Sequence, residues 1–379
     1  MPPHISGAHG LLSAARALTC ALTCALTCAL APLAPAAAQV ATGLKWQVLG
    51  DISARYEHTD ASEPSFVLGD IDLWFQSQLS ERWSGMGELM LMDLNKGGDP
   101  EYHMHPARLF LRYLHSDALQ LQVGQMHTPI GFYSQLYPHG AVFFEPAINR
   151  PLLARVKRSE EFLPLHTVGV MLTGTLSLGE VMEMQYFVGV GNGDAHGGID
   201  TNLWKAPYAQ LRFSPLAVEG LTVGLSGYVD KITSVEYVSQ GALHQLATSA
   251  TVYYDAYPVE LLIEGFWLKH GKNFRRVFGA EAPSSPQDLA GEAATTSLLG
   301  GYAQLLYSWE EHSVFALAEA FERDANDTLF NEHTPYLVYW GASWGYRRFL
   351  SQNLLLKAGH GYNWADDLHR VDLQLAYRL

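Results

Sequence analysis

Polar and apolar residues alternate along most of this 379-residue chain, and this alternation restricts the possible folds more than any other feature. Between Lys45 and Glu57, for example, Trp46, Ile52 and other apolar residues interleave with polar ones. Successive side chains of a β-strand point to opposite faces, so such a segment has one apolar and one polar face. After residue 38 no uninterrupted apolar stretch approaches the roughly 18 residues that a membrane-spanning helix needs. We therefore expect an all-β fold.

The alternation predicts sixteen strands. They cover residues 45–57, 66–79, 83–94, 106–115, 118–126, 167–177, 181–191, 206–214, 220–231, 245–256, 259–270, 298–309, 312–323, 336–348, 353–363 and 368–379. Most are long enough to cross a bilayer at a tilt. A soluble sandwich with one face on a core would show the same alternation, so the connections must decide between the two folds.

The connections between the predicted strands alternate between short and long. Short joins include 80–82, 116–117, 178–179, 257–258 and 310–311, and long connections include 127–166, 193–205, 231–244, 271–297 and 324–335. Outer-membrane barrels have short periplasmic turns and long extracellular loops, whereas a sandwich has no reason to follow this rule. The sequence therefore predicts a transmembrane antiparallel β-barrel of about sixteen strands over residues 39–379.

Aromatic residues and the last strand support a membrane barrel. Trp46, Tyr307, Trp309 and Trp340 lie near strand ends on the apolar face, where their amphipathic rings suit the headgroup layer. The final strand alternates up to Leu379, the last residue. It resembles the terminal strand that the barrel assembly machinery recognises, although that signal usually ends in Phe or Trp. We expect this machinery, outer-membrane lipid and lipopolysaccharide as partners.

Residues 1–38 have the pattern of a secretory signal peptide. They contain one charge, Arg16, then a small-residue apolar run that ends in three alanines before Gln39. All three cysteines, Cys20, Cys24 and Cys28, lie in this run. Each follows a threonine, which argues against a lipid-anchored cysteine. We expect cleavage near Gln39, export to the bacterial outer membrane, and a mature chain with no disulfide.

Charge and motifs argue against several functions. The net charge of −14 argues against nucleic acid as a partner. The glycine-rich run 189–194 ends a strand with no helix pattern behind it, so it is not a phosphate-binding loop. The chain has no G-x-S-x-G motif. We expect no enzymatic activity and no cofactor.

The histidines suggest a metal hypothesis that the sequence alone does not complete. His103 and His105 lie two residues apart, a spacing that places both rings on one side of an extended chain. Two histidines need further ligands, which the sequence does not place. Scattered loop and rim histidines are the simpler interpretation, and we expect no metal site.

Three stretches resemble the phosphate-selective porin O/P family. They are 71–75 (IDLWF), 123–132 (VGQMHTPIGF) and 186–193 (YFVGVGNG). The resemblance implies a sixteen-stranded barrel, often trimeric, whose long third loop folds inward to narrow the pore. It also implies phosphate as a substrate, which the mixed charges of the chain do not support. A homotrimer is therefore expected, with the permeating solute left open.

The third long connection, 127–166, is the candidate pore constriction. Its length and its Phe143-Phe144 and Leu152-Leu153 pairs suggest that it packs against the barrel wall. Its charged residues either line an eyelet that orients solutes or pair with one another in a solvated loop. They are Glu145, Arg150, Arg155, Lys157, Arg158, Glu160 and Glu161.

The polar faces of the strands add candidate wall bases that would face the lumen. These are Lys45, Arg55, Arg108, Arg112, Arg212, Lys357 and Arg370. Acidic residues share the same faces, so no continuous basic track is expected. The pattern favours a passive or weakly selective porin. The alternatives are a closed or plugged barrel acting as a receptor or assembly component, and a barrel hydrolase.

Overall fold

The computed structural model describes most of the chain after the leader. The described residues are 43–58, 63–93, 102–137, 143–154, 162–163, 165–193, 202–233, 243–271, 277–278 and 295–379. Residues 1–41 form a unit separate from residues 42–379. The signal peptide lies outside the described residues and stays a prediction.

Sixteen strands follow one another through the described part of residues 42–379. They are β1 (Lys45–Glu57), β2 (Ser65–Gln78), β3 (Trp83–Asp93), β4 (Tyr102–Ser116), β5 (Leu119–His127), β6 (His166–Leu178), β7 (Met182–Gly191), β8 (Ala206–Pro215), β9 (Leu221–Ile232), β10 (Leu243–Ala256), β11 (Val259–Gly271), β12 (Thr295–Trp309), β13 (His312–Arg323), β14 (Val338–Ser351), β15 (Leu354–Asn363) and β16 (Leu368–Arg378). Each pairs antiparallel with its neighbours in sequence.

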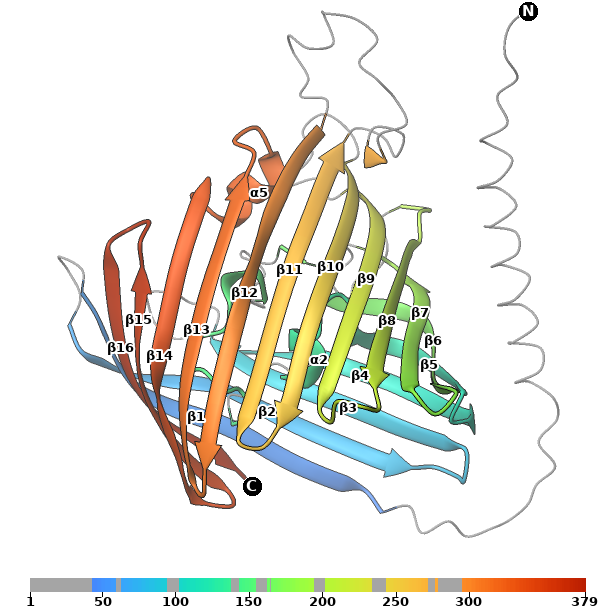
Figure 1. Cartoon of the computed structure of the whole chain (residues 1–379), viewed down its shortest axis with the longest axis horizontal. Helices are drawn as coiled ribbons and strands as arrows, with labels where there is room; N and C mark the ends of the chain where they lie inside the picture. Colours follow the sequence, from blue (N-terminus) through green and yellow to red (C-terminus); the bar gives the residue numbers. More distant parts are fainter. Residues whose placement is uncertain are drawn as a thin grey trace, which may run out of the picture. The chain divides into compact units, whose positions relative to one another are not determined.

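The sheet closes on itself because β1 also pairs with β16 (Figure 1). Ile52 lies opposite Leu375 and Arg55 opposite Asp372 across this seam. Leu379 extends the seam, since its amide donates to the carbonyl of Val48 at 2.8 Å. A closed sheet leaves no unpaired edge, which a membrane-spanning sheet requires. The predicted antiparallel barrel of sixteen strands is confirmed.

The largest boundary difference is at β4, which begins four residues before the predicted start at 106. Proline cannot donate a ladder hydrogen bond, so Pro106 would interrupt a regular strand. The structure places it at a β-bulge, where Leu89 pairs with Pro106, Glu88 pairs with Arg108, and Ala107 is the extra residue. A bulge tolerates proline and allows the strand to continue to Tyr102.

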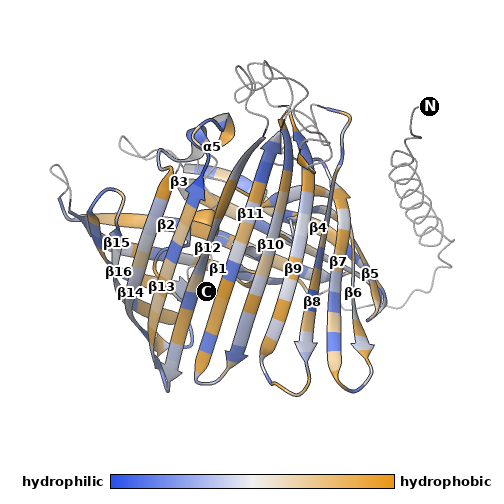
Figure 2. Ribbon diagram, turned by 45° about the horizontal axis from the view of Figure 1, so that its top comes forward, coloured by the Kyte–Doolittle hydropathy of each residue, from blue (hydrophilic) through white to orange (hydrophobic). Residues whose placement is uncertain are grey.

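The two faces of the barrel differ as the alternation requires, and Figure 2 shows alternating apolar and polar bands along the strands. Outward side chains such as Trp46 and Trp340 are 64% and 60% exposed, which suits contact with lipid. Inward polar side chains such as Asp51 and Gln374 are buried. Among the described residues, no helix is both long enough and apolar enough to cross a membrane.

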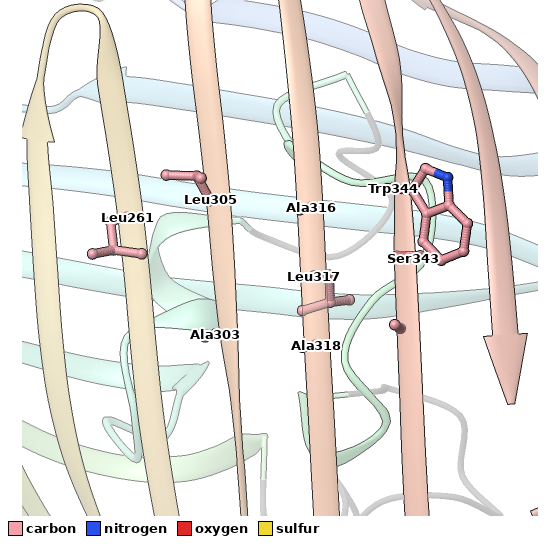
Figure 3. A pocket seen from close by; sticks show the side chains of 9 residues that line it. Leu261, Ala303, Leu305, Ala316, Leu317, Ala318, Ser343 and Trp344 are labelled. Atoms are coloured by element: carbon pink, nitrogen blue, oxygen red, sulfur yellow. The ribbon is translucent and has the colours of Figure 1, made fainter. Parts of the chain in front are cut away.

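A shallow apolar depression crosses β12 to β14 (Figure 3). Small side chains at Ala303, Ala316 and Ala318 line it, together with the larger Leu305 and Trp344. Val314 lies two residues before Ala316, on the same face of β13, and is 42% exposed. The depression therefore lies on the outer face of β13. No charged side chain lines the depression. It therefore suits a hydrocarbon chain and not a hydrophilic solute.

The described parts of the long connections include three short helices. The helix α2 (Tyr133–Leu136) and the 3-10 helix η1 (Leu152–Ala154) lie between β5 and β6, and α5 (Thr328–His333) lies between β13 and β14. The end of the barrel that carries these connections is the long-loop end, and the opposite end is the short-turn end. Figure 1 shows α5 at the long-loop end and α2 inside the ring of strands.

Candidate functional site

The described parts of the connection between β5 and β6 are residues 128–137, 143–154, 162–163 and 165, called here the inner segment. Its Phe132 and Leu152 are 1% and 5% exposed and belong to one apolar cluster with inward wall residues such as Phe266. In a barrel that crosses a membrane, loop side chains reach this burial only by packing against the inner wall. The wall behind the inner segment is therefore an apolar core and not a water-lined surface.

Glu264 on β11 is the main anchor of the inner segment. Its buried carboxylate accepts hydrogen bonds from the backbone amides of Phe132 and Tyr133, the latter at 3.3 Å. It also accepts from the hydroxyls of Thr251, at 2.7 Å, and Tyr302. Four donors around one carboxylate satisfy a charge that would otherwise be costly to bury. Glu264 thereby fixes the start of α2 against β10 to β12.

Two glycines permit this close approach. Gly131 has φ +69°, a backbone conformation that side-chain-bearing residues rarely adopt, and a Cβ there would lie 2.9 Å from Glu264 Oε1. Its amide reaches the hydroxyls of Ser226 and Ser249 at 3.2 and 3.1 Å. At Gly224 a Cβ would lie 2.4 Å from the Phe132 ring. Both positions therefore need glycine for the inner segment to reach the wall.

Two wall bases hold the second half of the inner segment by its backbone. Lys357 on β15 is fully buried, and its Nζ donates to the carbonyls of Glu145 at 2.7 Å and Ala147 at 3.2 Å. Arg347 on β14 also donates to the Glu145 carbonyl, at 3.4 Å. Farther along, the Leu152 amide donates to Glu319 on β13. Lys357 was predicted to line the lumen, and here it positions the loop.

The charges of the inner segment itself are paired. Arg150 Nε bonds the Glu145 carboxylate, and its Nη2 donates to the carbonyl of Tyr137 at 2.8 Å. Burial by itself lowers the pKa of Arg150, but the adjacent Glu145 outweighs burial, and the pKa lies above its usual value. These two residues therefore form an internal ion pair and do not face each other across a passage. The other candidates, Arg155, Lys157, Arg158, Glu160 and Glu161, lie outside the described residues.

The inner segment extends to the short-turn end of the barrel. Phe143 packs with Leu49, Leu355 and Ala376, and the last two lie at the short-turn ends of β15 and β16. The neighbouring ring of Phe144 stacks on Trp74 of β2 at 6.0 Å between centroids. These rings pack beside the seam between β1 and β16, so the inner segment also supports barrel closure.

Three predicted wall bases are paired with acids. Arg55 and Arg370 both bond Asp372, at 2.8 and 2.5 Å. Arg108 bonds Glu88, which is fully buried, and its guanidinium lies 5.1 Å from the centre of the Trp74 ring. Glu57 also lies 3.8 Å from Arg370, so three acids face these three arginines and leave little net charge around them.

The remaining predicted wall bases lie in different surroundings. Arg212 lies between the Phe132 and Phe187 rings, at 4.2 and 4.8 Å from their centres, and its Nε donates to Gln210 at 2.8 Å. Lys45 is exposed at the start of β1. Arg112 is half-buried, and its Nε has no hydrogen-bond partner among the described residues. Because Arg112 is partly exposed and no acid pairs with it among the described residues, its charge can act on a passing solute.

Sequence reasoning missed Glu264 and Arg347 as site residues. The alternation placed Glu264 on the lumen face, but nothing in the sequence indicates that loop amides reach it. Arg347 precedes a second arginine, Arg348, so the local pattern does not say which of the two faces inward. In the structure Arg347 pairs with Lys357, whose side chain points inward, so the side chain of Arg347 points inward too.

A second connection, through α5, docks inside the long-loop end. Asp327 caps α5 by accepting from the Phe330 amide at 2.9 Å, and it also bonds the buried His270 on β11 at 2.7 Å. The Phe330 ring lies 4.5 Å from the His270 ring and 6.2 Å from Phe162 of the inner segment. Asp327 therefore connects α5 to the barrel wall, and Phe330 connects α5 to the inner segment.

We expect the docking of α5 to depend on pH. Burial alone raises the pKa of Asp327, but hydrogen bonds from His270, Thr296 and Phe330 outweigh it, and the pKa lies below its usual value near 3.8. A carboxyl whose folded pKa is lowered stabilises the fold above its unfolded pKa and loses this contribution as the pH falls through the folded value. Pepsin digestion should cut the purified protein near Phe330 slowly at pH 4.5 and faster at pH 2.5.

Asp327→Asn is the matched variant for this prediction, because it keeps the size of the side chain and removes the titrating group. Its cleavage near Phe330 should already be fast at pH 4.5, with little further change at pH 2.5. Equal cleavage of both proteins at pH 4.5 would show that Asp327 does not hold α5 in place.

No protein-family model matches the sequence, and no curated protein shows significant sequence similarity to it. Solved structures do share its fold. The outer-membrane channel DcaP of Acinetobacter baumannii has a TM-score of 0.58 at 11% identity, over 92% of this chain and 100% of that one. An anion-selective porin from Comamonas acidovorans has a TM-score of 0.59 at 9% identity, over 89% and 100%. OmpT of Vibrio cholerae, solved in a trimer form, has 0.55 at 11%, over 89% and 99%. At these identities the likeness concerns the fold, which is that of outer-membrane barrels.

Proposed function

We propose that this protein is an outer-membrane porin through which small hydrophilic solutes and ions diffuse passively, with weak selectivity. The observation that carries the proposal is the concentration of the inner segment's anchoring hydrogen bonds on one part of the wall. Those of the described residues named above lie on strands β8 to β15, whereas near β1 and β2 the Phe143 and Phe144 rings pack beside Leu49 and Trp74. A lumen narrowed from one side keeps a passage along the other side.

Most of the wall from β2 to β7 suits a hydrated passage, apart from the Trp74 ring that stacks on Phe144. Several polar side chains on this wall point into the barrel and remain partly solvent-accessible. They are Gln76, Arg112 and Gln185. Polar side chains of this kind line water-filled barrels. The Trp74, Glu88 and Arg108 cluster lies on the same wall, with the Trp74 Nε1 atom 3.1 Å from Glu88. Paired acids and bases favour weak selectivity and do not favour phosphate as a specific substrate.

We also propose an assembly and a family for this protein. A homotrimer is supported by the trimer form of OmpT of Vibrio cholerae, a protein of similar fold. The stretches at 71–75, 123–132 and 186–193 support a relationship to the phosphate-selective porins, and the matching folds include an anion-selective porin. The exported form begins near Gln39, and the bilayer, lipopolysaccharide and the barrel assembly machinery are its partners.

Planar-bilayer recording of the purified protein tests the function. We expect stepwise conductance at low voltage and no turnover of lipid or peptide. The tight packing of the inner segment against the wall favours a second candidate, a plugged barrel that acts as a receptor. A folded protein that never conducts supports that candidate, and turnover of lipid or peptide supports the barrel hydrolase.

Arg112→Gln should shift the reversal potential of the channel toward cation preference in a salt gradient. Arg112 lies on the solvent-accessible wall without a paired acid among the described residues, so its field acts on passing ions. Lys45→Gln is the matched control, because it removes one base at the exposed start of β1. There salt screens a charge within about 8 Å. Equal shifts from both variants would place the ion path away from β4.

A further inference from the structure

Three histidines lie in a row across the outer face of the barrel seam. Tyr56 and Val371 pair across β1 and β16, and both are exposed on the outer face, at 39% and 50%. His58 lies two residues after Tyr56 and His369 two residues before Val371, so both lie on the same outer face. The His58 amide donates to the His369 carbonyl at 2.8 Å. On the next strand, His360 pairs with Val371. The row therefore runs over β1, β16 and β15 at the long-loop end.

Two of these rings already lie close enough to share one ion. His360 Nε2 and His369 Nδ1 are 3.1 Å apart. Nitrogens bound to one metal at ~2.0–2.1 Å lie about 2.9 Å apart at a right angle and about 3.3 Å apart at a tetrahedral angle. The observed separation lies between these values. A single ion could replace the hydrogen bond between the rings with little movement of either one.

The surroundings of the pair favour ligation. His369 is exposed and lies two residues from the 364–367 turn at the long-loop end, where an ion can reach it from water, while aromatic rings hold both imidazoles in place. Trp344 lies 4.6 Å from His360 and Tyr362 lies 4.4 Å from His369, measured between ring centres. His360 presents Nε2 to His369, so Nδ1 is left to carry the ring proton when Nε2 binds an ion. Pre-positioned rings reduce the entropy lost on binding.

We propose that His360 and His369 bind a divalent transition-metal ion, zinc or copper, with His58 as a third ligand and water completing the site. The His58 ring now lies near Tyr56, with Nδ1 3.4 Å from the tyrosine hydroxyl, and a rotation of this exposed side chain brings it toward His369. No group of three or more ligating side chains is already assembled among the described residues, these three histidines included, so the third ligand has to move into place. Three imidazoles and a water form a common zinc site. The bound ion would connect β15, β16 and β1 across the seam.

The sequence had directed attention to His103 and His105 instead. Those two residues lie on β4, where His105 pairs with the buried Met90 and so faces inward. His360 and His369 are nine residues apart and meet only because β15 and β16 pair. This placement separates the proposal from the pore, since a metal on the outer rim does not require conduction.

Binding of copper(II) and zinc(II) to the untagged, folded protein in detergent tests the proposal. Calorimetry should find one site tighter than the rest, and copper electron paramagnetic resonance should show two or three coordinated imidazole nitrogens. His360→Ala and His369→Ala should each weaken this site by about tenfold or more, and His58→Ala should weaken it less. Zinc should raise the unfolding temperature of the wild type and not of the double variant.

Two control variants distinguish this site from background binding. His312→Ala removes a histidine on β13 that already bonds Tyr346, and the double variant His103→Ala, His105→Ala removes the inward pair. Both should keep the tight site. His369→Gln replaces His369→Ala if the latter fails to fold, as judged by heat-dependent gel mobility. A tight site that survives loss of both His360 and His369, or no tight site in the wild type, overturns the proposal.

Discussion

Deletion of Ala376 to Leu379 should reduce the yield of folded barrel by about tenfold or more. These residues close the sheet: Ala376 pairs with Asp51, Tyr377 with Gly50, and Leu379 exchanges backbone hydrogen bonds with Val48. Without them the first half of β1 has an open edge, which a membrane cannot tolerate because it offers no water to unpaired backbone groups. The deletion also removes Ala376 from its contact with Phe143. The measurement is the fraction of protein that shows heat-dependent mobility on a gel.

Leu379→Phe is the matched control for this deletion. It keeps the backbone bonds to Val48 and restores the aromatic end that the assembly signal usually carries. Its yield should equal or exceed that of the wild type. A truncated chain that folds at normal yield would show that the end of β16 is dispensable for closure.

The strands were predictable because their information is local. In β13 the predicted and observed limits are both 312 and 323, since a period of two is visible within one strand. The alternation of long and short connections then predicted how successive strands join in the barrel. Neither step needs to know which distant residues meet.

The anchors of the inner segment were not predictable for the opposite reason. Glu264 lies 132 positions from Phe132, and Lys357 lies 212 positions from Glu145. No local pattern reports such pairings. Glu145 and Arg150 are five residues apart, and the sequence left open whether they pair or face each other. The histidine pair on β15 and β16 was missed because it depends on register.

Replacement of residues 133–154 by a short Gly-Ser linker should increase single-channel conductance by roughly threefold or more. The described part of this stretch contains α2, the Phe143-Phe144 pair and η1, and it packs from the short-turn end up to Glu319 on β13. Its removal takes a large apolar body out of the lumen and exposes the inward faces of β8 to β15 to water. We also expect a lower unfolding temperature, because Phe266, Tyr302 and similar wall residues lose their packing.

A subtler variant tests the same mechanism without deletion. Glu264→Gln keeps the size of the side chain but replaces one acceptor oxygen by a donor, so at least one of its four donors loses its partner. The inner segment should then detach part of the time, and current records should show additional open levels above the wild-type level. Shortening the connection between β11 and β12 by residues 280–290 is the control, since it removes loop residues and keeps the four donors to Glu264. The variant with residues 133–154 replaced could fold and conduct like the wild type, and Glu264→Gln could show no additional open levels. These two results together would mean that the inner segment does not limit the flow of ions.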